Sequence, residues 1–356
     1  MPRRNITRRH VLQGLAATPL ALPALTRRAA AAAPAPSAVT PALIEAAVKE
    51  GKASWYTAVD LPVAERIAKA FEAKYPGIAV RVERSGGERI YQRIGQEYAS
   101  KIHAVDVVNS SDAAHFIVWK REGLLAPYVP QDVASHYPPE HKDPDGLFAS
   151  WRIWLCVIGY NTKLVKPEEA PKSYADLLDP KWVGKMVKAH PGYSGTIMTA
   201  TFQMARDIGW SYFEKLAAQK VMQVQSSADP PKKLALGERA VMADGNEYNL
   251  VQLKEKGDPV EIVYASEGTP IIVGPSGIMK DAPNPNAARL LQSFMFSVEC
   301  QQLMVDWGGL RSMHALVKDK AGRRPLHEIK LMKDDPAAVE KQADDIKARY
   351  TKYFKV

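Results

Sequence analysis

Hydrophobic positions from Ala42 onward alternate between short apolar runs and helical stripes. The segment ASWYT at residues 53–57 is typical of a short buried strand. Val63, Ile67 and Phe71 then recur at helical spacing, which predicts a helix with one buried face. This order of strand, turn and helix indicates the beginning of an α/β domain.

The same order occurs twice more along the chain. Residues 78–82 (IAVRV) alternate like a strand, and Ile90, Ile94 and Tyr98 mark a helix after the turn RSGGE. The run VDVV then leads through NSSD into the helical segment AAHFIVWKREG. Strands separated by single helices predict a mainly parallel sheet, whose ligands bind in loops beyond the carboxyl ends of the strands.

The pattern restarts after a long apolar run, WRIWLCVIGYNTKLV at residues 151–165. A second α/β unit follows, and it ends at another apolar run, EGTPIIVGPSGIM at residues 267–279. Two apolar crossings between two α/β units predict two lobes that are joined by strands and close by hinge motion. We predict lobe 1 at residues 42–155 and 271–320, lobe 2 at 156–270, and a helical segment packed on the lobes at 321–356.

Residues 1–33 have the pattern of an export signal. Arg8 and Arg9 precede a short apolar run from Leu15 to Leu25, and small residues follow it. This resembles a twin-arginine signal peptide, although it departs from the usual motif at two positions. The run is too short to span a bilayer, which needs about twenty apolar residues. We therefore expect export by the twin-arginine translocase, cleavage near Ala33 and a periplasmic location.

Removal of that segment changes the charge of the protein. The full chain carries a formal net charge of +9, and six of its arginines lie within the predicted signal. The remaining lysines are mixed with glutamates and aspartates, which is typical of solvated surfaces. The composition therefore does not indicate a basic surface of the kind that binds nucleic acid, and we expect no nucleic-acid partner.

Cysteine and histidine usage gives no metal or redox signature. Cys156 and Cys300 are the two cysteines, and both lie in segments that predict burial. We expect two buried thiols, although an oxidising compartment would permit a disulfide. The histidines, among them His103, His115 and His141, lack a compact ligand spacing. Their spacing predicts surface or helix-end positions, and we expect no cofactor.

The stretch HPGYSGTIMTATFQMA at residues 190–205 is the strongest candidate for a ligand contact. A turn is followed by Ser194, Gly195 and Thr196, which open a helix with an apolar stripe. The first amides of a helix lack internal partners, so with two hydroxyls beside them they suit an anion. A serine here is also an ordinary N-cap, and this motif alone leaves both interpretations open.

Four segments resemble the extracellular solute-binding proteins of ABC importers, a group with ferric-iron, phosphonate, thiamine and sugar-phosphate receptors. The segments are APKSYADLLDPKWVGKM, HPGYSGT, EGTPIIVGPSGI and APNPNAARLLQSFMFS, and they lie within a similarity from about Ser54 to Gln302. The resemblance implies an α/β, two-lobed periplasmic-binding-protein fold of type II with hinge strands between the lobes. It also implies a monomer that delivers a small solute to a permease and its ATPase, without identifying the solute.

The resemblance places the contacts with the solute in loops that face the cleft between the lobes. In lobe 2 it implies Tyr193, Ser194, Gly195 and Thr196, and in lobe 1 it implies Thr57, Ser85, Gly86, Gly87 and Ser110. Tyr56 and Trp154 are candidates for stacking on an organic ligand, although lone aromatic residues are more often core residues. We expect the helix start at Ser194 to hold an anionic, organic or phosphorylated solute.

Ferric iron is the alternative ligand. Iron receptors of this family place two adjacent tyrosines where this chain reads NEYNLVQLKEKG, and only Tyr248 is present there. The candidate oxygen ligands beside Tyr248 are Glu88, Asp244 and Glu267. Hard Fe(III) needs several anionic oxygens, so we rank iron second, with Tyr248 and Glu88 as its expected ligands.

A serine hydrolase is a weaker alternative. The motif GYSGT is similar to the G-x-S-x-G nucleophile turn, but Thr196 occupies the fifth position. No histidine and acid follow in a persuasive order, and the chain lacks a phosphate loop or dinucleotide motif. We therefore expect a binding protein and not an enzyme.

Overall fold

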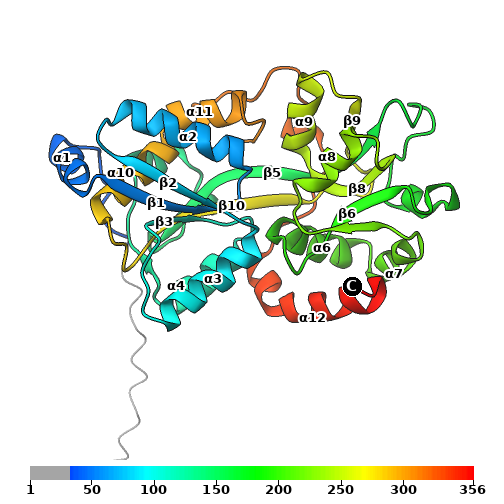
Figure 1. The fold of residues 1–356 in the computed structure, drawn as a ribbon, viewed down its shortest axis with the longest axis horizontal. Helices are drawn as coiled ribbons and strands as arrows, with labels where there is room; N and C mark the ends of the chain where they lie inside the picture. Colours follow the sequence, from blue (N-terminus) through cyan, green and yellow to red (C-terminus); the bar gives the residue numbers. More distant parts are fainter. Residues whose placement is uncertain (1–32) are drawn as a thin grey trace, which may run out of the picture. The chain divides into compact units, whose positions relative to one another are not determined.

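The computed structural model describes residues 33–356, so the twin arginine and apolar run of the predicted signal lie outside the described residues. The described chain folds around a mixed sheet with the strand order β2-β1-β3-β10-β5-β8-β6-β7, in which β4 pairs with β10 and β9 with β5 (Figure 1). Helices cover both faces of this sheet (Figure 1). The predicted α/β fold with two lobes is confirmed. The expectation of a mainly parallel sheet was wrong, because β5 and β10 run antiparallel to the strands beside them.

Lobe 1 is built on parallel pairs of β1 with β2 and β3. Its strands are β1 (Lys52–Thr57), β2 (Ala79–Arg84), β3 (Val107–Asn109) and β4 (Leu125–Ala126). Its helices are α1 (Pro41–Glu50), α2 (Leu61–Lys74), α3 (Gly87–Ala99), α4 (Ala114–Arg121), α5 (Gln131–His136), α10 (Pro285–Phe296) and α11 (Val298–Asp306). The predicted stripe of Val63, Ile67 and Phe71 on α2 is completely buried.

Lobe 2 repeats this plan, with β6 parallel to β7 and β8. Its strands are β6 (Met186–Ala189), β7 (Met222–Val224), β8 (Val241–Asn246) and β9 (Val260–Val263). Its helices are α6 (Gly195–Asp207), α7 (Trp210–Ala218), α8 (Asp229–Ala235) and α9 (Glu247–Glu255). Short 3-10 turns occur at Pro139–His141, Ala175–Leu178, Pro180–Trp182 and Leu326–Glu328.

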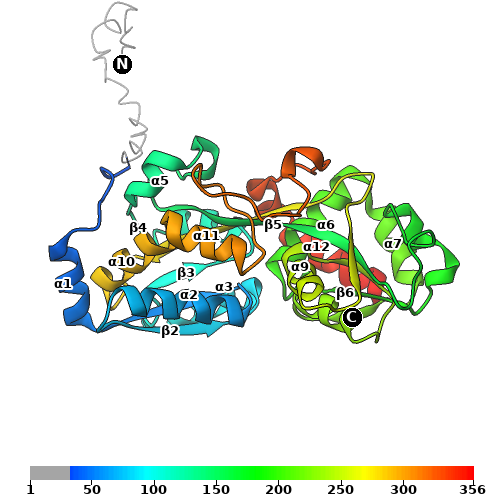
Figure 2. The same ribbon diagram turned by 90° about the horizontal axis from the view of Figure 1, so that it is seen from above.

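Two strands connect the lobes at the apolar runs that predicted them. β5 (Phe148–Asn161) pairs with β10 (Ile271–Met279) through its first half and with β8 and β9 through its second half. The chain returns beside this crossing, where the Cys156 amide donates to the Pro270 carbonyl at 3.0 Å. Figure 2 shows β5 running from the half of the molecule with α10 and α11 into the half with α6 and α9. The exact residue limits of the lobes stay a prediction.

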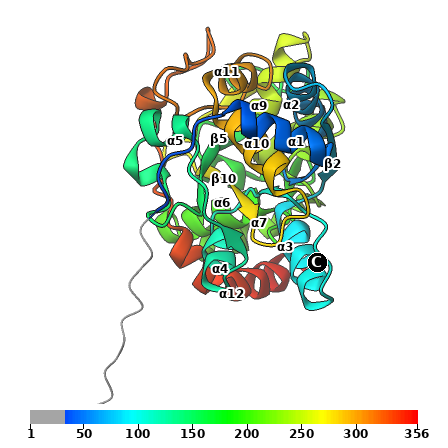
Figure 3. The same ribbon diagram turned by 90° about the vertical axis from the view of Figure 1, so that its left-hand side faces the viewer.

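Helix α12 (Pro336–Phe354) packs on both lobes, along α4 and α6 (Figure 3). Lys188 donates to the buried Tyr350 hydroxyl at 2.8 Å, which fixes the helix to lobe 2. Glu340 pairs with Arg121 of α4 at 3.1 Å, which attaches the helix to lobe 1. The last helix therefore bridges the lobes outside the hinge strands.

The pairing of the two cysteines and the ability of the helices to span a membrane can also be assessed. Cys156 and Cys300 are both buried and unpaired, as predicted. Within residues 33–356, every helix is too short or too polar to cross a bilayer.

Candidate functional site

Helix α6 begins at the junction that the sequence predicted. Ser194 is its N-cap, with its Oγ accepting a hydrogen bond from the Ile197 amide at 3.4 Å. Ser194 and Thr196 are only 3% and 2% exposed, so this helix start is covered by other parts of the protein. The ordinary capping role of Ser194 is therefore present, in a buried setting.

Glycine at position 195 lets lobe 1 approach the start of α6. A Cβ added at Gly195 would lie 2.8 Å from the Asp112 Cβ and 2.9 Å from the Ser111 Oγ. Both of these residues belong to the loop that follows β3, in lobe 1. The first turn of α6 therefore meets the carboxyl end of a lobe 1 strand, as the fold class requires.

Helix α3 makes a similar approach from lobe 1. A Cβ added at Gly86 would overlap the Tyr193 carbonyl oxygen, and one added at Gly87 would lie 3.2 Å from the Ser110 Oγ. The Arg89 guanidinium carbon lies 5.3 Å from the centroid of the Tyr193 ring. The N-termini of α3 and α6 thus converge on the same loop, and their free amides favour an anion there.

Strand β5 contributes a buried arginine beside this convergence. The Arg152 guanidinium carbon lies 4.1 Å from the centroid of the Trp154 ring, and Trp154 meets Tyr248 edge-on at 6.4 Å. A Cβ added at Gly274, the β10 residue opposite Arg152, would lie 2.9 Å from the Trp154 ring and 3.1 Å from the Ser110 carbonyl oxygen. Arg152, Trp154 and the Ser110 loop therefore lie next to one another.

Arg152 has no ion-pair partner in the part of the chain that the structure describes. The side chain is 1% exposed, and its Nε and Nη2 atoms have no hydrogen-bond partner among residues 33–356. Burial lowers the pKa of the Arg152 guanidinium to about 10, and the neighbouring Arg84 adds to this effect. A buried polar group without a partner is costly, so these atoms are free to bind an acidic group.

Arg84, at the end of β2, is the second cation near this point. Its Nη2 donates to the Ser226 Oγ of lobe 2 at 3.1 Å, and its Nε donates to the Val59 carbonyl at 3.3 Å. Guanidinium groups bind carboxylate and phosphate oxygens with two parallel hydrogen bonds. Arg84 and Arg152 therefore place two guanidinium charges near each other.

A cavity of about 620 Å³ opens beside Arg84, between the lobes. Asp60 of lobe 1 and Asn249 of lobe 2 also line it, and the Asn249 Nδ2 donates to the Asp60 carboxylate at 3.3 Å. Trp307 of lobe 1 and Lys256 of lobe 2 form part of its wall. A cavity of this size accommodates the body of a small organic solute.

Among the other predicted contacts, the Thr57 Oγ1 accepts from the Val59 amide, and the Ser85 amide donates to the Thr57 carbonyl at 3.1 Å. These two residues therefore turn the chain at the carboxyl ends of β1 and β2. Tyr56 points into the core of lobe 1, where its hydroxyl donates to Glu97 at 3.0 Å. The structure does not bring Tyr56 together with Arg152.

Asp244 and Glu267 lie apart from Arg152 and Tyr248. The Asp244 carboxylate pairs with the completely buried Lys188 at 3.1 Å inside lobe 2. The Glu267 carboxylate accepts a hydrogen bond from the Ala175 amide at 3.0 Å. Both carboxylates therefore contact groups of lobe 2 itself, although the Asp244 Oδ1 has no hydrogen-bond partner among residues 33–356.

The structure also separates the two residues named for iron. The Glu88 carboxylate contacts His115 at 2.9 Å and Lys347 of α12 at 2.8 Å. The Tyr248 hydroxyl instead accepts from the Asn246 Nδ2 at 3.3 Å, and burial raises the pKa of this phenol. Glu88 and Tyr248 therefore have no contact partner in common.

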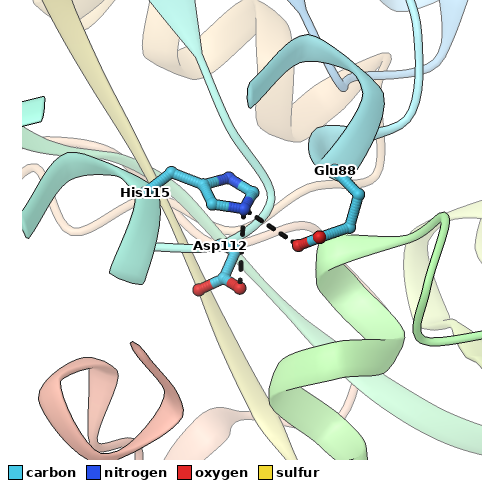
Figure 4. Close-up of side chains that lie close together, drawn as sticks. All are labelled: Glu88, Asp112 and His115. Carbon is cyan, nitrogen blue, oxygen red and sulfur yellow. Dashed lines mark hydrogen bonds and ion pairs between the residues drawn. The ribbon is translucent and has the colours of Figure 1, made fainter. Parts of the chain in front are cut away.

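Glu88, Asp112 and His115 form a cluster behind the loop after β3 (Figure 4). His115 stands in the first turn of α4, which agrees with the helix-end alternative of the prediction, but it is only 5% exposed and not on the surface. Its nearest acid, Glu88, is remote in the sequence, which is why spacing did not reveal the cluster. His115 and Lys347 already supply positive charge to Glu88, and we assign no metal here.

Sequence reasoning missed Arg152 and Arg84. Arg152 lies in the run WRIWLCV, which was interpreted only as a crossing strand. A single charged residue inside an apolar strand is a usable signal, because burial of a charge needs a partner. No such partner occurs among residues 33–356, and only the structure can show this absence.

The family model and the related sequences all describe solute-binding proteins. The family model for bacterial extracellular solute-binding proteins matches residues 104–326. A probable ABC transporter periplasmic-binding protein of Sinorhizobium fredii, y4fP, is 26% identical over 286 residues, covering 77% of this chain and 74% of the relative. A putative 2-aminoethylphosphonate-binding periplasmic protein of Salmonella typhimurium is 28% identical over 251 residues, covering 66% and 70%.

Solved structures show the same fold. The periplasmic binding protein AfuA from Actinobacillus pleuropneumoniae, with exogenous fructose-6-phosphate bound, superposes with a TM-score of 0.79 at 24% identity, covering 86% of this chain and 99% of AfuA. Iron-bound HitA from Pseudomonas aeruginosa gives a TM-score of 0.72 at 24% identity, covering 85% and 99%. Proteins of this one fold thus hold chemically different ligands, so the ligand has to be argued from the site.

Proposed function

The chain belongs to the bacterial extracellular solute-binding proteins, and on this premise we propose that it captures an anionic organic solute between its lobes. Its function is that of the solute-binding component of an ABC importer. We further propose that the solute carries a phosphate, phosphonate or comparable acidic group. The predicted site residues at the starts of α3 and α6 would contact this group.

The observation that carries the proposal is the unpaired Arg152. Its Nε and Nη2 are buried without an acceptor in the described chain, and it lies beside Trp154 and Tyr248. An acidic group with two oxygens would satisfy both nitrogens and neutralise the charge. Binding would therefore relieve a cost that the ligand-free protein carries.

Three further features support an anion. Arg84 lies near Arg152 and adds a second guanidinium. The N-termini of α3 and α6 carry free amides and the positive ends of the helix dipoles. The cavity beside Arg84 leaves room for an organic body, so a bare inorganic ion would fill only part of the space.

Two relatives have names or titles that fit this class. The Salmonella typhimurium relative is named for 2-aminoethylphosphonate, and the AfuA structure contains fructose-6-phosphate. Both compounds combine an acidic phosphorus group with an organic part. They are therefore the natural first probes for this protein, without being its assigned solutes.

The same site is unfavourable for ferric iron. A trivalent cation bound to Tyr248 would lie close to the Arg152 charge, and the buried phenol holds its proton more strongly than usual, because burial raises its pKa. Fe(III) needs several anionic oxygens, and neither Glu88 nor Asp244 is available beside Tyr248. Arg152 therefore favours the organic anion over iron.

The cellular setting is also part of the proposal. We infer export by the twin-arginine translocase, a periplasmic location for the mature chain and delivery of the solute to a permease with its ATPase. A monomer without enzymatic activity is sufficient for this role. Replacement of Arg8 and Arg9 by lysine should leave precursor in the cytoplasm, and normal periplasmic accumulation would contradict this export route.

Calorimetric titration of the mature protein tests the ligand class. Fructose 6-phosphate and 2-aminoethylphosphonate should bind more tightly than fructose and ethylamine, which lack the acidic group. Arg152→Met should abolish the difference, whereas Arg81→Met, at an exposed position on β2, should preserve it. Equal binding of fructose and fructose 6-phosphate, or an unchanged Arg152→Met variant, would refute the proposal.

A further inference from the structure

Asp60 is the N-cap of α2, but its carboxylate does not cap that helix. The side chain makes no capping hydrogen bond, and its Oδ2 instead accepts from the Nδ2 of Asn249 in lobe 2 at 3.3 Å. An aspartate N-cap usually satisfies a free amide of the first turn, as Asp335 does at the start of α12 with the Ala338 amide at 3.0 Å. The Asp60 carboxylate is therefore turned toward lobe 2, at the cavity that Asp60 and Asn249 both line.

The Asp60 charge has no cation in contact with it. Asp60 forms no ion pair with a lysine, arginine or histidine of residues 33–356, although Arg84 lines the same cavity. The Arg84 guanidinium donates to the Ser226 Oγ and the Val59 carbonyl instead. The cavity between the lobes therefore contains a carboxylate and a guanidinium that do not neutralise each other by contact.

The other two acids of the cavity wall have partners of their own. Glu255 pairs with Lys320 at 2.9 Å, and Asp306 accepts from the Gln302 Nε2 at 2.8 Å. Asp60 is thus the acid of this wall that is best placed to receive a group of the solute.

Tyr248 connects Asp60 to the two guanidinium groups of the proposed anion site. Burial raises the pKa of the Tyr248 phenol most, the Asp60 charge raises it further, and the charges of Arg152 and Arg84 oppose this rise. The phenol therefore has one negative and two positive charges near it. A small solute at this point meets both signs of charge.

Asp60 also orients the amides of Asn249 and Asn246. A carboxylate only accepts hydrogen bonds, so the Asn249 Nδ2 faces Asp60 and the Asn249 Oδ1 faces away from it. That Oδ1 accepts from the Asn246 Nδ2 at 2.9 Å, which leaves the Asn246 Oδ1 without a hydrogen-bond partner among residues 33–356. Asn246 is 2% exposed and contacts the Tyr248 hydroxyl. A buried acceptor next to Tyr248 therefore lacks a donor.

We propose that Asp60 holds a cationic group of the solute, so that the captured compound is a zwitterion with an ammonium group in addition to its acid. The proposal rests on the proposed function, because it assumes that the acid binds at Arg152 and Arg84. An ammonium group has three donors and a positive charge, so it both hydrogen-bonds to a carboxylate and neutralises it. A hydroxyl would donate one hydrogen bond and leave the Asp60 charge without a counter-charge.

The same carboxylate disfavours solutes that carry only an acid. Asp60 and Arg84 line one cavity of about 620 Å³, so an acid bound near Arg84 is repelled by the Asp60 charge unless a cation lies between them. Specificity is a difference between affinities, and both attraction and repulsion contribute to it. Asp60 is therefore a specificity-determining residue of the site.

Calorimetric titrations of the mature protein with three phosphonates of equal chain length test the proposal. The compounds 2-aminoethylphosphonate, 2-hydroxyethylphosphonate and n-propylphosphonate share the acid and end in an ammonium, a hydroxyl or a methyl group. Wild type should bind the amino compound roughly ten- to a hundredfold more tightly than the propyl compound, which is the range of one hydrogen bond to a charged group. Equal affinity for the amino and hydroxy compounds would show selection of a neutral donor and overturn the cationic class.

Asp60→Asn removes the charge and keeps an N-cap for α2, because asparagine caps helices as well as aspartate does. The variant should bind 2-aminoethylphosphonate roughly tenfold more weakly and n-propylphosphonate about threefold more tightly, because attraction and repulsion are both lost. A purely structural role for Asp60 would change both affinities in the same direction. Asp335→Asn, which removes one acid at an exposed N-cap, should preserve the wild-type order of affinities.

The outcomes distinguish this proposal from the proposed function. Equal binding of the three phosphonates to wild type, or a shift of both affinities in one direction in Asp60→Asn, would refute the role of Asp60 and leave anion capture intact. If neither the phosphonates nor fructose 6-phosphate bound to wild type, capture of an acidic organic solute would itself be contradicted.

Discussion

The Arg152 guanidinium stacks 4.1 Å above the Trp154 ring and has no carboxylate partner in the described chain. Stacking on an aromatic face stabilises a cation only modestly, by about 0.5 to 2 kcal/mol. It does not compensate for a charge that is removed from water. The protein therefore maintains an unfavourable buried charge, and this cost is understandable if the charge binds a ligand.

Replacement of Arg152 should increase the stability of the ligand-free protein and abolish the binding of anions. Arg152→Met removes an unpaired buried charge and keeps an apolar side chain of similar length, so the ligand-free protein should become more stable, by about 1 to 4 kcal/mol. Binding of anionic probes should be lost in the same variant. Urea unfolding followed by circular dichroism measures the first effect, and calorimetry measures the second.

Arg311 provides the matched control for that experiment. It is also buried, but its Nη2 pairs with the Glu247 carboxylate at 2.7 Å. Arg311→Met leaves Glu247 buried without its partner and should cost about 3 to 5 kcal/mol of unfolding free energy. A loss of stability in Arg152→Met as large as that in Arg311→Met would show that Arg152 is structural.

Approach of the lobes should depend on Gly86. A Cβ at this position would overlap the Tyr193 carbonyl of lobe 2, so Gly86→Ala should hold the lobes apart. We expect about tenfold weaker solute binding, because the binding-competent closed state becomes less populated. Small-angle scattering with saturating probe should give a larger radius of gyration for the variant than for wild type.

Gly95 is the matched glycine on the same helix. A Cβ there meets no atom within 4 Å, so Gly95→Ala should preserve binding and stabilise the protein by about 0.5 to 1 kcal/mol. Equal compaction and affinity in Gly86→Ala and wild type would argue against lobe closure at this contact.

The sequence predicted local structure better than it predicted the site. Apolar periodicity located the two crossings and the start of α6 at Ser194, because burial and capping are local properties of the chain. Arg152 was missed because its importance comes from an absent partner, which only three-dimensional packing can show. Tyr56 was a candidate for ligand stacking, but alternation along β1 directs its side chain to Glu97 in the core.

The buried pair of Lys188 and Asp244 should anchor α12. Lys188 contacts Asp244 at 3.1 Å and the Tyr350 hydroxyl of α12 at 2.8 Å. Lys188→Met leaves Asp244 unpaired and should cost about 3 to 5 kcal/mol. Lys352→Met, at an exposed position on α12, should stay within about 0.5 kcal/mol of wild type in urea unfolding.

Acidification should partly rescue the Lys188→Met variant. Burial raises the pKa of Asp244, and the ammonium of Lys188 opposes that rise in wild type. Without the ammonium the folded pKa of Asp244 rises further, so the folded state binds the proton more tightly than the unfolded state. The unfolding free energy of the variant should therefore increase as the pH falls toward that pKa. If the loss of unfolding free energy relative to wild type did not change with pH, an unpaired Asp244 carboxylate would not be its cause.

Iron binding is tested by colour. Ferric citrate added to the ligand-free protein should produce no phenolate charge-transfer band, because Tyr248 is protonated and lies near Arg152. Tyr248→Phe should give the same spectrum as wild type. A stoichiometric coloured complex that is lost in Tyr248→Phe would establish iron as the ligand instead.

Mass analysis of the solute retained by gently purified mature protein tests the central claim most directly. The wild type should release one equivalent of an organic compound with a phosphate, phosphonate or carboxylate group, and Arg152→Met purified in parallel should release none. Recovery of a neutral compound, of ferric iron, or of the same anion from both proteins would contradict capture of an anionic solute by Arg152.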